Sequence, residues 1–165
     1  MSSASASPKV RTRAAVSSTP AGDLLTIGGD IDDSTSLAPF VAQLKRSPII
    51  DLGDVTFINS VGVREWITLL GELAQRGLRV TLRNVSEPMV RQMTMVLEAR
   101  GDAAVESFYA PYACDSCGDE RALLLQVDQH KDALEAHKPP PLPCPSCGSE
   151  ADFDEFPNRY LSFLS

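Results

Sequence analysis

Apolar residues between positions 24 and 108 follow two alternating spacings along the chain. Runs typical of strands begin at Leu24, Ile49 and Leu78, and a last short run covers 103–108. Between these runs, apolar residues recur three or four positions apart, the spacing of a helix face, over 37–44, 63–73 and 89–97. Because strands and helices alternate about every 15–20 residues, the pattern predicts an α/β fold with a mixed, mainly parallel sheet covered by helices.

Polar residues next to these runs predict where the helices begin. Ser36, which precedes a proline suited to the first turn, is the expected N-cap of the first helix, and Ser60 is the expected N-cap of the second. The third helix opens after Ser86 and carries Met89 and Met93 on one face. We expect this methionine face to pack in the core, because the flexible thioether chain fills irregular apolar space well.

Composition divides the chain into three parts. Residues 1–22 are mostly Ser, Ala and Thr and bury too little apolar surface to offset the entropy of ordering, so we expect a flexible tail. Residues 23–109 carry the alternating pattern and form the α/β domain, with a core of its own. Residues 110–165 contain all four cysteines and a run of prolines, and they form a second, smaller unit.

Charge and hydropathy argue against several classes of partner. The 165 residues carry a net charge of −7, and the first 22 are basic, so the remainder is more acidic than the whole. Such a surface repels polyanions, and we expect no nucleic-acid binding. No stretch reaches the roughly 20 apolar residues of a membrane helix, and the N-terminus lacks the apolar region of a secretory signal. These features predict a cytoplasmic protein without membrane association, whose cysteines stay reduced.

The four cysteines form two matching motifs. Cys114 and Cys117 are separated by two residues and followed by glycine, and Cys144 and Cys147 repeat the same arrangement. Each motif places two thiolates on one tight turn, and the glycine allows the positive φ that turns backbone amides toward the sulfurs. Four sulfurs are the tetrahedral set that Zn²⁺ prefers, so the spacing predicts one structural zinc ion in a small zinc-ribbon-like domain.

Other interpretations of the cysteines remain open at this stage. Iron in a rubredoxin-like site uses the same four ligands, whereas a redox dithiol is not expected to occur twice in so short a segment. His130 and His137 can also bind metal, but four cysteines complete the site, and we expect both histidines at the surface. Ribbon strands are expected over 121–127 and 151–153.

Aromatic and apolar residues crowd the C-terminal end of the chain: Phe153, Phe156, Tyr160, Phe163 and Leu164. A unit of about 50 residues buries little surface by itself, so we expect these side chains to pack on it or on the larger domain. An exposed aromatic peptide that docks a partner is the alternative interpretation.

The segment from Asp51 to Val63 carries the clearest functional signal of the larger domain. A buried strand ends at Ile58, Asn59 and Ser60 form a turn, and a helix follows. This run resembles the STAS domain of bacterial anti-sigma-factor antagonists, whose pattern is a strand, an Asp-Ser-Ser/Thr-Gly turn and a helix. The resemblance covers roughly 23–109, and Ser60 matches the serine that a partner kinase phosphorylates in that family.

The chain departs from the family pattern at two positions of the turn. Asn59 stands where the family has Asp, and Val61 replaces the second Ser/Thr. Arg64 lies one helical turn after Ser60, where it can pair with a phosphate, and Glu65 follows it. The resemblance implies that these five residues, 59–61 and 64–65, contact a protein partner.

The leading hypothesis is a cytoplasmic signalling adaptor. It binds a protein partner, which the resemblance implies to be a serine-kinase anti-sigma factor, through a STAS-like domain switched by phosphorylation of Ser60. The alternatives are a sensor that holds a small ligand (a nucleotide or a lipid) in the STAS-like fold, and a constitutive scaffold subunit. An enzyme is not expected, because the chain has no phosphate-cradling P-loop, no nucleophile elbow and no acid pair near a histidine.

Overall fold

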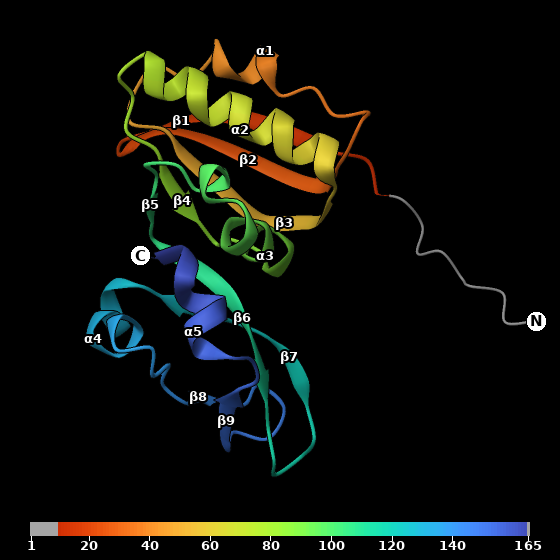
Figure 1. Cartoon of the computed structure of the whole chain (residues 1–165), viewed down its shortest axis with the longest axis vertical. Helices are drawn as coiled ribbons and strands as arrows, with labels where there is room; N and C mark the ends of the chain where they lie inside the picture. The colour runs from red at the N-terminus through yellow and green to blue at the C-terminus, as the bar shows by residue number, and fades with distance from the viewer. Residues whose placement is uncertain (1–9, 165) are drawn as a thin grey trace, which may run out of the picture.

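The computed structural model describes residues 10–164, which form two sheets with helices packed around them (Figure 1). The strands are β1 (Arg13–Thr19), β2 (Gly22–Ile31), β3 (Ile49–Ile58), β4 (Thr81–Arg83), β5 (Ala104–Val105), β6 (Ser107–Ala113), β7 (Glu120–Gln126), β8 (Leu142–Pro143) and β9 (Glu150–Phe153). The α-helices are α1 (Ala38–Val41), α2 (Ser60–Gln75), α3 (Glu87–Met95), α4 (Lys131–Glu135) and α5 (Pro157–Tyr160), and the 3₁₀ helices are η1 (Leu97–Ala99), η2 (Asp128–His130) and η3 (Leu161–Leu164). Within this part of the chain, no helix combines the length and apolarity needed to cross a bilayer.

The first sheet has the order β1-β2-β3-β4-β5. Strands β2 to β5 run parallel to one another, and β1 pairs with β2 in the antiparallel direction. The parallel strands are joined through helical crossovers, which a parallel pair requires. The predicted mixed, mainly parallel sheet with helices is therefore confirmed.

Strand β1 corrects the prediction of a flexible tail over residues 1–22. Residues 13–19 form a continuous antiparallel ladder with β2, and residues 1–9 lie outside the described part of the chain. The strand is at the edge of the sheet and alternates exposed and half-buried positions, with Ala14 and Val16 packed on the core. An edge strand of this kind needs few large apolar residues, because its backbone hydrogen bonds and one covered face hold it in place.

The first helix also begins differently from the prediction. Its N-cap is Leu37, and no side chain caps it, so Ser36 does not take that role. The amide of Leu37 instead donates to Oε1 of Glu65 on α2, at 2.9 Å. A long side chain from a neighbouring helix thus satisfies a donor that a local serine was expected to satisfy.

The second sheet has the order β7-β6-β9-β8 and is antiparallel throughout. The predicted ribbon strands over 121–127 and 151–153 correspond to β7 and β9, within one residue at each end. The apolar run expected as one strand over 103–108 is instead divided between β5 of the first sheet and β6 of the second. The boundary expected between 109 and 110 therefore falls inside β6.

The two sheets share one core, which corrects the expectation of separate cores. One cluster of buried residues extends from β2 and β3 through α2 and α3 to β6 and the C-terminal η3. Backbone bonds also cross the junction: Val85 N–H donates to Ser107 O at 3.0 Å, and Tyr109 N–H donates to Val85 O at 2.8 Å. The unit that contains the four cysteines and the α/β domain consequently form one packed body.

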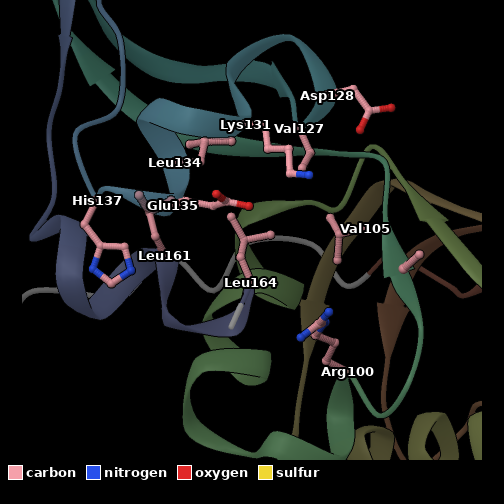
Figure 2. A pocket seen from close by; sticks show the side chains of 11 residues that line it. Arg100, Val105, Val127, Asp128, Lys131, Leu134, Glu135, His137, Leu161 and Leu164 are labelled. Atoms are coloured by element: carbon pink, nitrogen blue, oxygen red, sulfur yellow. The ribbon is translucent and has the colours of Figure 1, made fainter.

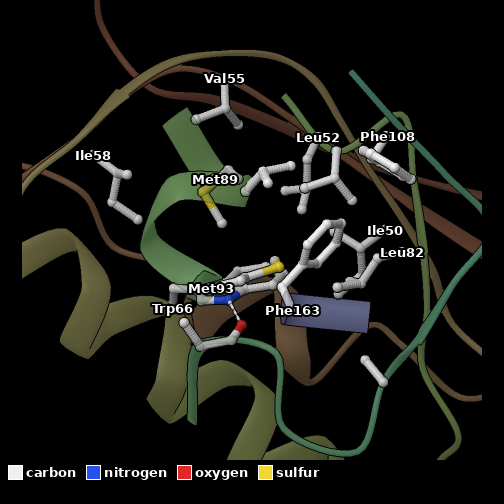
Figure 3. Close-up of a cluster of buried hydrophobic side chains, with 14 of the residues drawn as sticks. Ile50, Leu52, Val55, Ile58, Trp66, Leu82, Met89, Met93, Phe108 and Phe163 are labelled. Atoms are coloured by element: carbon white, nitrogen blue, oxygen red, sulfur yellow. Dashed lines mark hydrogen bonds between the residues drawn. The ribbon is translucent and has the colours of Figure 1, made fainter. Parts of the chain in front are cut away.

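Helix α3 lies where the two sheets meet (Figure 1). Met89 and Met93 on this helix are fully buried, which confirms the predicted core role of the methionine face. Leu97, expected on the same face, is 78% exposed because the helix ends at Met95 and a 3₁₀ turn follows. Trp66 of α2 reaches the same region and donates from Nε1 to the carbonyl of Ala99 (Figure 3).

The C-terminal aromatics pack against this junction. The ring of Phe163 stands edge-on to Phe108, with 5.1 Å between centroids, and Figure 3 shows it beside the core residues of the first sheet. Tyr160 is buried, its hydroxyl donates to the Tyr109 carbonyl at 2.6 Å, and burial raises its pKa. The Arg91 guanidinium of α3 lies 5.5 Å from the Tyr160 ring centroid. These contacts support packing on the larger domain over an exposed docking peptide, with Phe156, 76% exposed, as the exception.

Candidate metal centre and the Ser60 surface

The two cysteine motifs fold into turns of the same geometry. Each lies between two paired strands, the first between β6 and β7 and the second between β8 and β9. In the first turn, Gly118 N–H donates to the Cys114 carbonyl at 2.8 Å, and in the second Gly148 N–H donates to the Cys144 carbonyl at the same distance. Both glycines have φ of 77°, a left-handed conformation that side chains disfavour. The local sequence therefore fixes both turns in the way predicted.

The fold brings all four sulfurs together. The Sγ atoms of Cys114, Cys117, Cys144 and Cys147 lie within 4.8 Å of one another. The two contacts between motifs measure 3.5 Å and 3.6 Å, far beyond the roughly 2.05 Å of a disulfide bond. The arrangement is a possible metal site that uses one ligand atom from each residue, and the prediction that these four cysteines converge is confirmed.

Hydrogen bonds to the sulfurs make their acidities unequal. The backbone amide of Ser149 is the largest cause that lowers the pKa of Cys147 to about 6. The backbone amide of Asp119 acts to lower the pKa of Cys117, but desolvation and the three neighbouring sulfurs outweigh it and raise this pKa to about 12. All four sulfurs can become thiolates together only if a cation offsets their mutual repulsion, which is what a bound metal ion does.

A polar network joins the two turns outside the sulfurs. One carboxylate oxygen of Asp119 accepts from Arg121 Nε at 2.6 Å and from Ser146 Oγ at 3.1 Å. Arg121 also donates from Nη2 to Ser146 Oγ at 2.9 Å, and these bonds lower the pKa of Asp119. This network could not be identified from the sequence, because Asp119 and Ser146 belong to different motifs whose approach depends on the tertiary fold.

Neither histidine belongs to the sulfur cluster. His130 and His137 are both half-buried, and Nδ1 of His137 lies 2.9 Å from Oδ1 of Asn158. The ligand set among the described residues is therefore sulfur alone, as expected from the sequence.

Asn59, and not Ser60, is the N-cap of α2, which corrects the sequence prediction. Its side-chain oxygen accepts from Gly62 N–H at 2.9 Å, and its backbone is extended, with φ of −105° and ψ of −177°. Ser60 is the first residue of the helix and is exposed. The amides of Ser60 and Val61 point from the first turn without an intrahelical partner, because the helix has no preceding residue to accept from them.

Apolar side chains are exposed on both sides of Ser60. Phe57, near the end of β3, is 49% exposed, and Val61 is 46% exposed. Arg64 is exposed and forms no ion pair with the described residues. We call the group formed by Phe57, Ser60, Val61 and Arg64 the Ser60 surface.

Two of the expected partner-contact residues have internal roles. Asn59 caps α2, and Glu65 is half-buried and accepts from the Leu37 amide. Phe57 was not identified from the sequence, since it lies in an apolar run that was assigned to a buried strand. Spacing gave no clear signal, because strand alternation places Phe57 on the same face as buried Val55, and the pairing with β2 shifts register between these two residues.

Gly62 sets how closely the start of α2 approaches β2. A Cβ atom at this position would lie 2.1 Å from the carbonyl oxygen of Ile31, a backbone atom that cannot move aside. We predict that Gly62→Ala lowers the free energy of unfolding by about 1–3 kcal/mol through overpacking. Gly71→Ala, on the same helix with open space around it, is the matched control and is expected to stabilise by about 0.5–1 kcal/mol. Urea denaturation tests the pair, and equal effects of the two substitutions contradict this role of Gly62.

The acidic turn after β2 is held by local hydrogen bonds. Asp30 accepts from Thr56 Oγ1 at 2.7 Å and from Val10 N–H at 3.1 Å. Asp32 is buried and accepts from the amide and hydroxyl of Ser34. These bonds explain the acidic residues without a bound cation.

Comparison with known proteins adds no family to this description. No protein-family model matches the chain. No curated protein matches its sequence at a significant level.

Proposed function

We propose that this protein is a cytoplasmic signalling adaptor, not an enzyme, that binds a protein partner through the Ser60 surface of a STAS-like domain. The observation that carries the proposal is an exposed serine at the first position of a 16-residue helix, between exposed Phe57 and Val61. Exposed apolar side chains beside a modifiable hydroxyl form a surface that a partner can cover and a charge can disrupt. The run Asn59–Gly62 and the order of strands and helices around it support the STAS resemblance.

Phosphorylation of Ser60 is the proposed switch. A phosphate at this position meets the unpartnered amides of the first helical turn and the positive end of the helix dipole, so it does not unfold α2. Arg64, one turn further along, supplies a cation without an ion pair to lose. The same phosphate places about two negative charges beside Phe57 and Val61, and a partner that covers these side chains must then desolvate those charges. Modification thus weakens docking while the fold is retained.

The partner that the resemblance implies is a serine-kinase anti-sigma factor. Such a partner is both the binder and the enzyme that modifies Ser60, so binding and release become one cycle. Release of the partner then depends on ATP, because the partner uses ATP to phosphorylate Ser60.

The metal that we propose for the four-cysteine site is one Zn²⁺ ion. Sulfurs each about 2.3 Å from a central zinc ion are about 3.8 Å apart in a tetrahedron. The two contacts between motifs, 3.5 Å and 3.6 Å, come close to this edge length. Four thiolates fill the coordination sphere, so the ion supplies a structural crosslink between the two turns and no open position for substrate. Elemental analysis of the purified protein distinguishes one zinc per chain from iron or no metal.

Capture of the partner tests the proposed function. The protein is immobilised with Ser60 unmodified and incubated with a lysate of the source cells, and bound proteins are identified by mass spectrometry. We expect a protein with an ATP-binding serine-kinase domain that, when purified and given ATP, phosphorylates Ser60. Thr68→Asp places a negative charge on the exposed side of α2, outside the Ser60 surface. It is expected to retain the partner, and it is the control for a charge placed at Ser60. A captured protein that does not modify Ser60 contradicts the switch.

Substitutions at the turn separate helix capping from signalling. Because Asn59 provides the cap, Asn59→Ala is expected to lower the free energy of unfolding by about 1 kcal/mol. Ser60 is exposed and does not cap the helix. Ser60→Ala is therefore expected to change the free energy of unfolding by no more than about 0.5 kcal/mol and to retain partner binding. Chemical denaturation measures both values. A Ser60→Ala variant that is as destabilised as Asn59→Ala assigns the serine a structural role and removes the basis for the switch.

A further inference from the structure

A cavity of about 360 Å³ lies at the junction of the two sheets, away from the Ser60 surface (Figure 2). One side is formed by Arg100 and Val105 of the first sheet region, and the opposite side by the segment that follows β7. The C-terminal residues Leu161 and Leu164 form part of the remaining wall. The size is in the lower range of cavities that bind small molecules, about 300–1,000 Å³.

The wall from the second unit is a segment with no part in the metal site. Helix α4 and the residues around it connect β7 to β8 without pairing in either sheet. Lys131, Leu134 and Glu135 all line the cavity, as their spacing on one helix face allows, and Leu134 is buried. Lys131 and Glu135 are exposed, so they line the cavity on its solvent side, whereas Leu134 beside them is buried.

The charges of this cavity are of both signs. Figure 2 shows Lys131 and Arg100 on opposite sides of the hollow with their charged ends directed into it, and the Glu135 carboxylate between the two walls. Lys131 and Glu135 form no ion pair with each other or with any other described residue. Asp128 lies at the margin, where its carboxylate is directed away from the hollow. The rest of the lining is apolar except for His137.

We propose that this cavity binds a small zwitterion with an apolar body, the chemistry of a free apolar α-amino acid. The ligand carboxylate is held by Lys131, its ammonium group by Glu135, and its side chain packs on Val105, Leu134 and Leu164. A fatty acid leaves Glu135 facing an anion, and an amine leaves Lys131 facing a cation, so neither class of ligand matches both charges. Because both units line the cavity, a bound ligand contacts both and stabilises the junction.

Isothermal titration calorimetry of the metal-loaded full chain tests the proposal. The probes are L-leucine, L-isoleucine, L-methionine and L-phenylalanine, with octanoate and hexylamine as ligands of single charge. We expect saturable binding of one amino acid per chain and at least tenfold weaker binding of both single-charge probes. The absence of binding by all four amino acids at millimolar concentration overturns the proposal, and so does octanoate or hexylamine binding as tightly as the best of them.

Matched variants locate the binding. Lys131→Met and Glu135→Gln are each expected to weaken binding by about tenfold or more, because each removes one charge-assisted contact. Lys138→Met and Glu120→Gln remove the same charges from exposed positions outside the cavity lining and are expected to leave the dissociation constant unchanged. Equal effects of the cavity and control substitutions overturn the assignment to this cavity. These measurements do not involve the Ser60 surface, so their outcome is independent of the proposed function.

Discussion

Removal of the metal is expected to unfold the C-terminal unit and, at the same time, to lower the stability of the α/β domain. Structural zinc contributes apparent binding free energies of about 10–16 kcal/mol to small metal-binding units, which have little other stabilisation. Here β6 enters directly from β5, and Tyr112 of β6 belongs to the same buried cluster as Met93 of α3. Loss of the metal-binding unit therefore exposes α3 as well.

The single tryptophan, Trp66, reports on the α/β domain, since it is fully buried there. We expect chelator treatment and the Cys144→Ser substitution both to shift the Trp66 fluorescence transition to lower denaturant concentration. Ser116→Ala, an exposed change inside the first turn, is the control and is expected to retain metal and stability. If the Trp66 transition is unchanged although all remaining thiols have become reactive, the two units are energetically independent, which contradicts the shared core.

Truncation of the Phe163 side chain is also expected to lower the free energy of unfolding by a large amount. Its side chain is 2% exposed and packs edge-on against Phe108, so Phe163→Ala removes a large buried side chain and leaves a cavity. Substitutions of this kind cost about 3–5 kcal/mol. The matched control is Phe156→Ala, because Phe156 is 76% exposed and its loss is expected to change stability by less than about 0.5 kcal/mol.

Denaturant unfolding followed by Trp66 fluorescence measures both phenylalanine variants. The difference between them isolates burial, since the residue type and the substitution are the same. Similar midpoints for the two variants exclude a structural role of the C-terminal segment in the shared core.

Features that depend on local spacing could be predicted from the sequence. The two turns at Cys114 and Cys144 follow from two-residue spacing and a glycine of positive φ, and both appear in the structure. The parallel sheet followed from the alternation of strand and helix patterns, because parallel strands need crossovers. In each case, the signal lies within a few residues of the feature it predicts.

Features that depend on distant contacts could not be predicted in the same way. Strand β1 carries small residues and forms because β2 offers it an edge to pair with. The Leu37 amide is satisfied by Glu65, 28 residues away, which replaced the expected cap at Ser36. The shared core depends on Phe163 reaching Phe108, a contact that no local pattern indicates.

The start of α2 could not be predicted from the sequence for a different reason. Asn59 and Ser60 are adjacent, and both residue types cap helices well, so the sequence could not place the boundary within one residue. The structure decides it through the Asn59 oxygen, which accepts from Gly62. This one-residue difference frees the Ser60 hydroxyl from capping, and it makes a signalling role for that hydroxyl compatible with a stable helix.

The Ser60 surface is proposed to bind a protein partner, and charge at Ser60 is proposed to release that partner. The most direct measurement is the dissociation constant of the captured kinase partner for the wild-type protein, Ser60→Asp and Thr68→Asp. We predict at least tenfold weaker binding for Ser60→Asp, a change of about 1.4 kcal/mol, and wild-type binding for Thr68→Asp. Equal dissociation constants for all three proteins would contradict it.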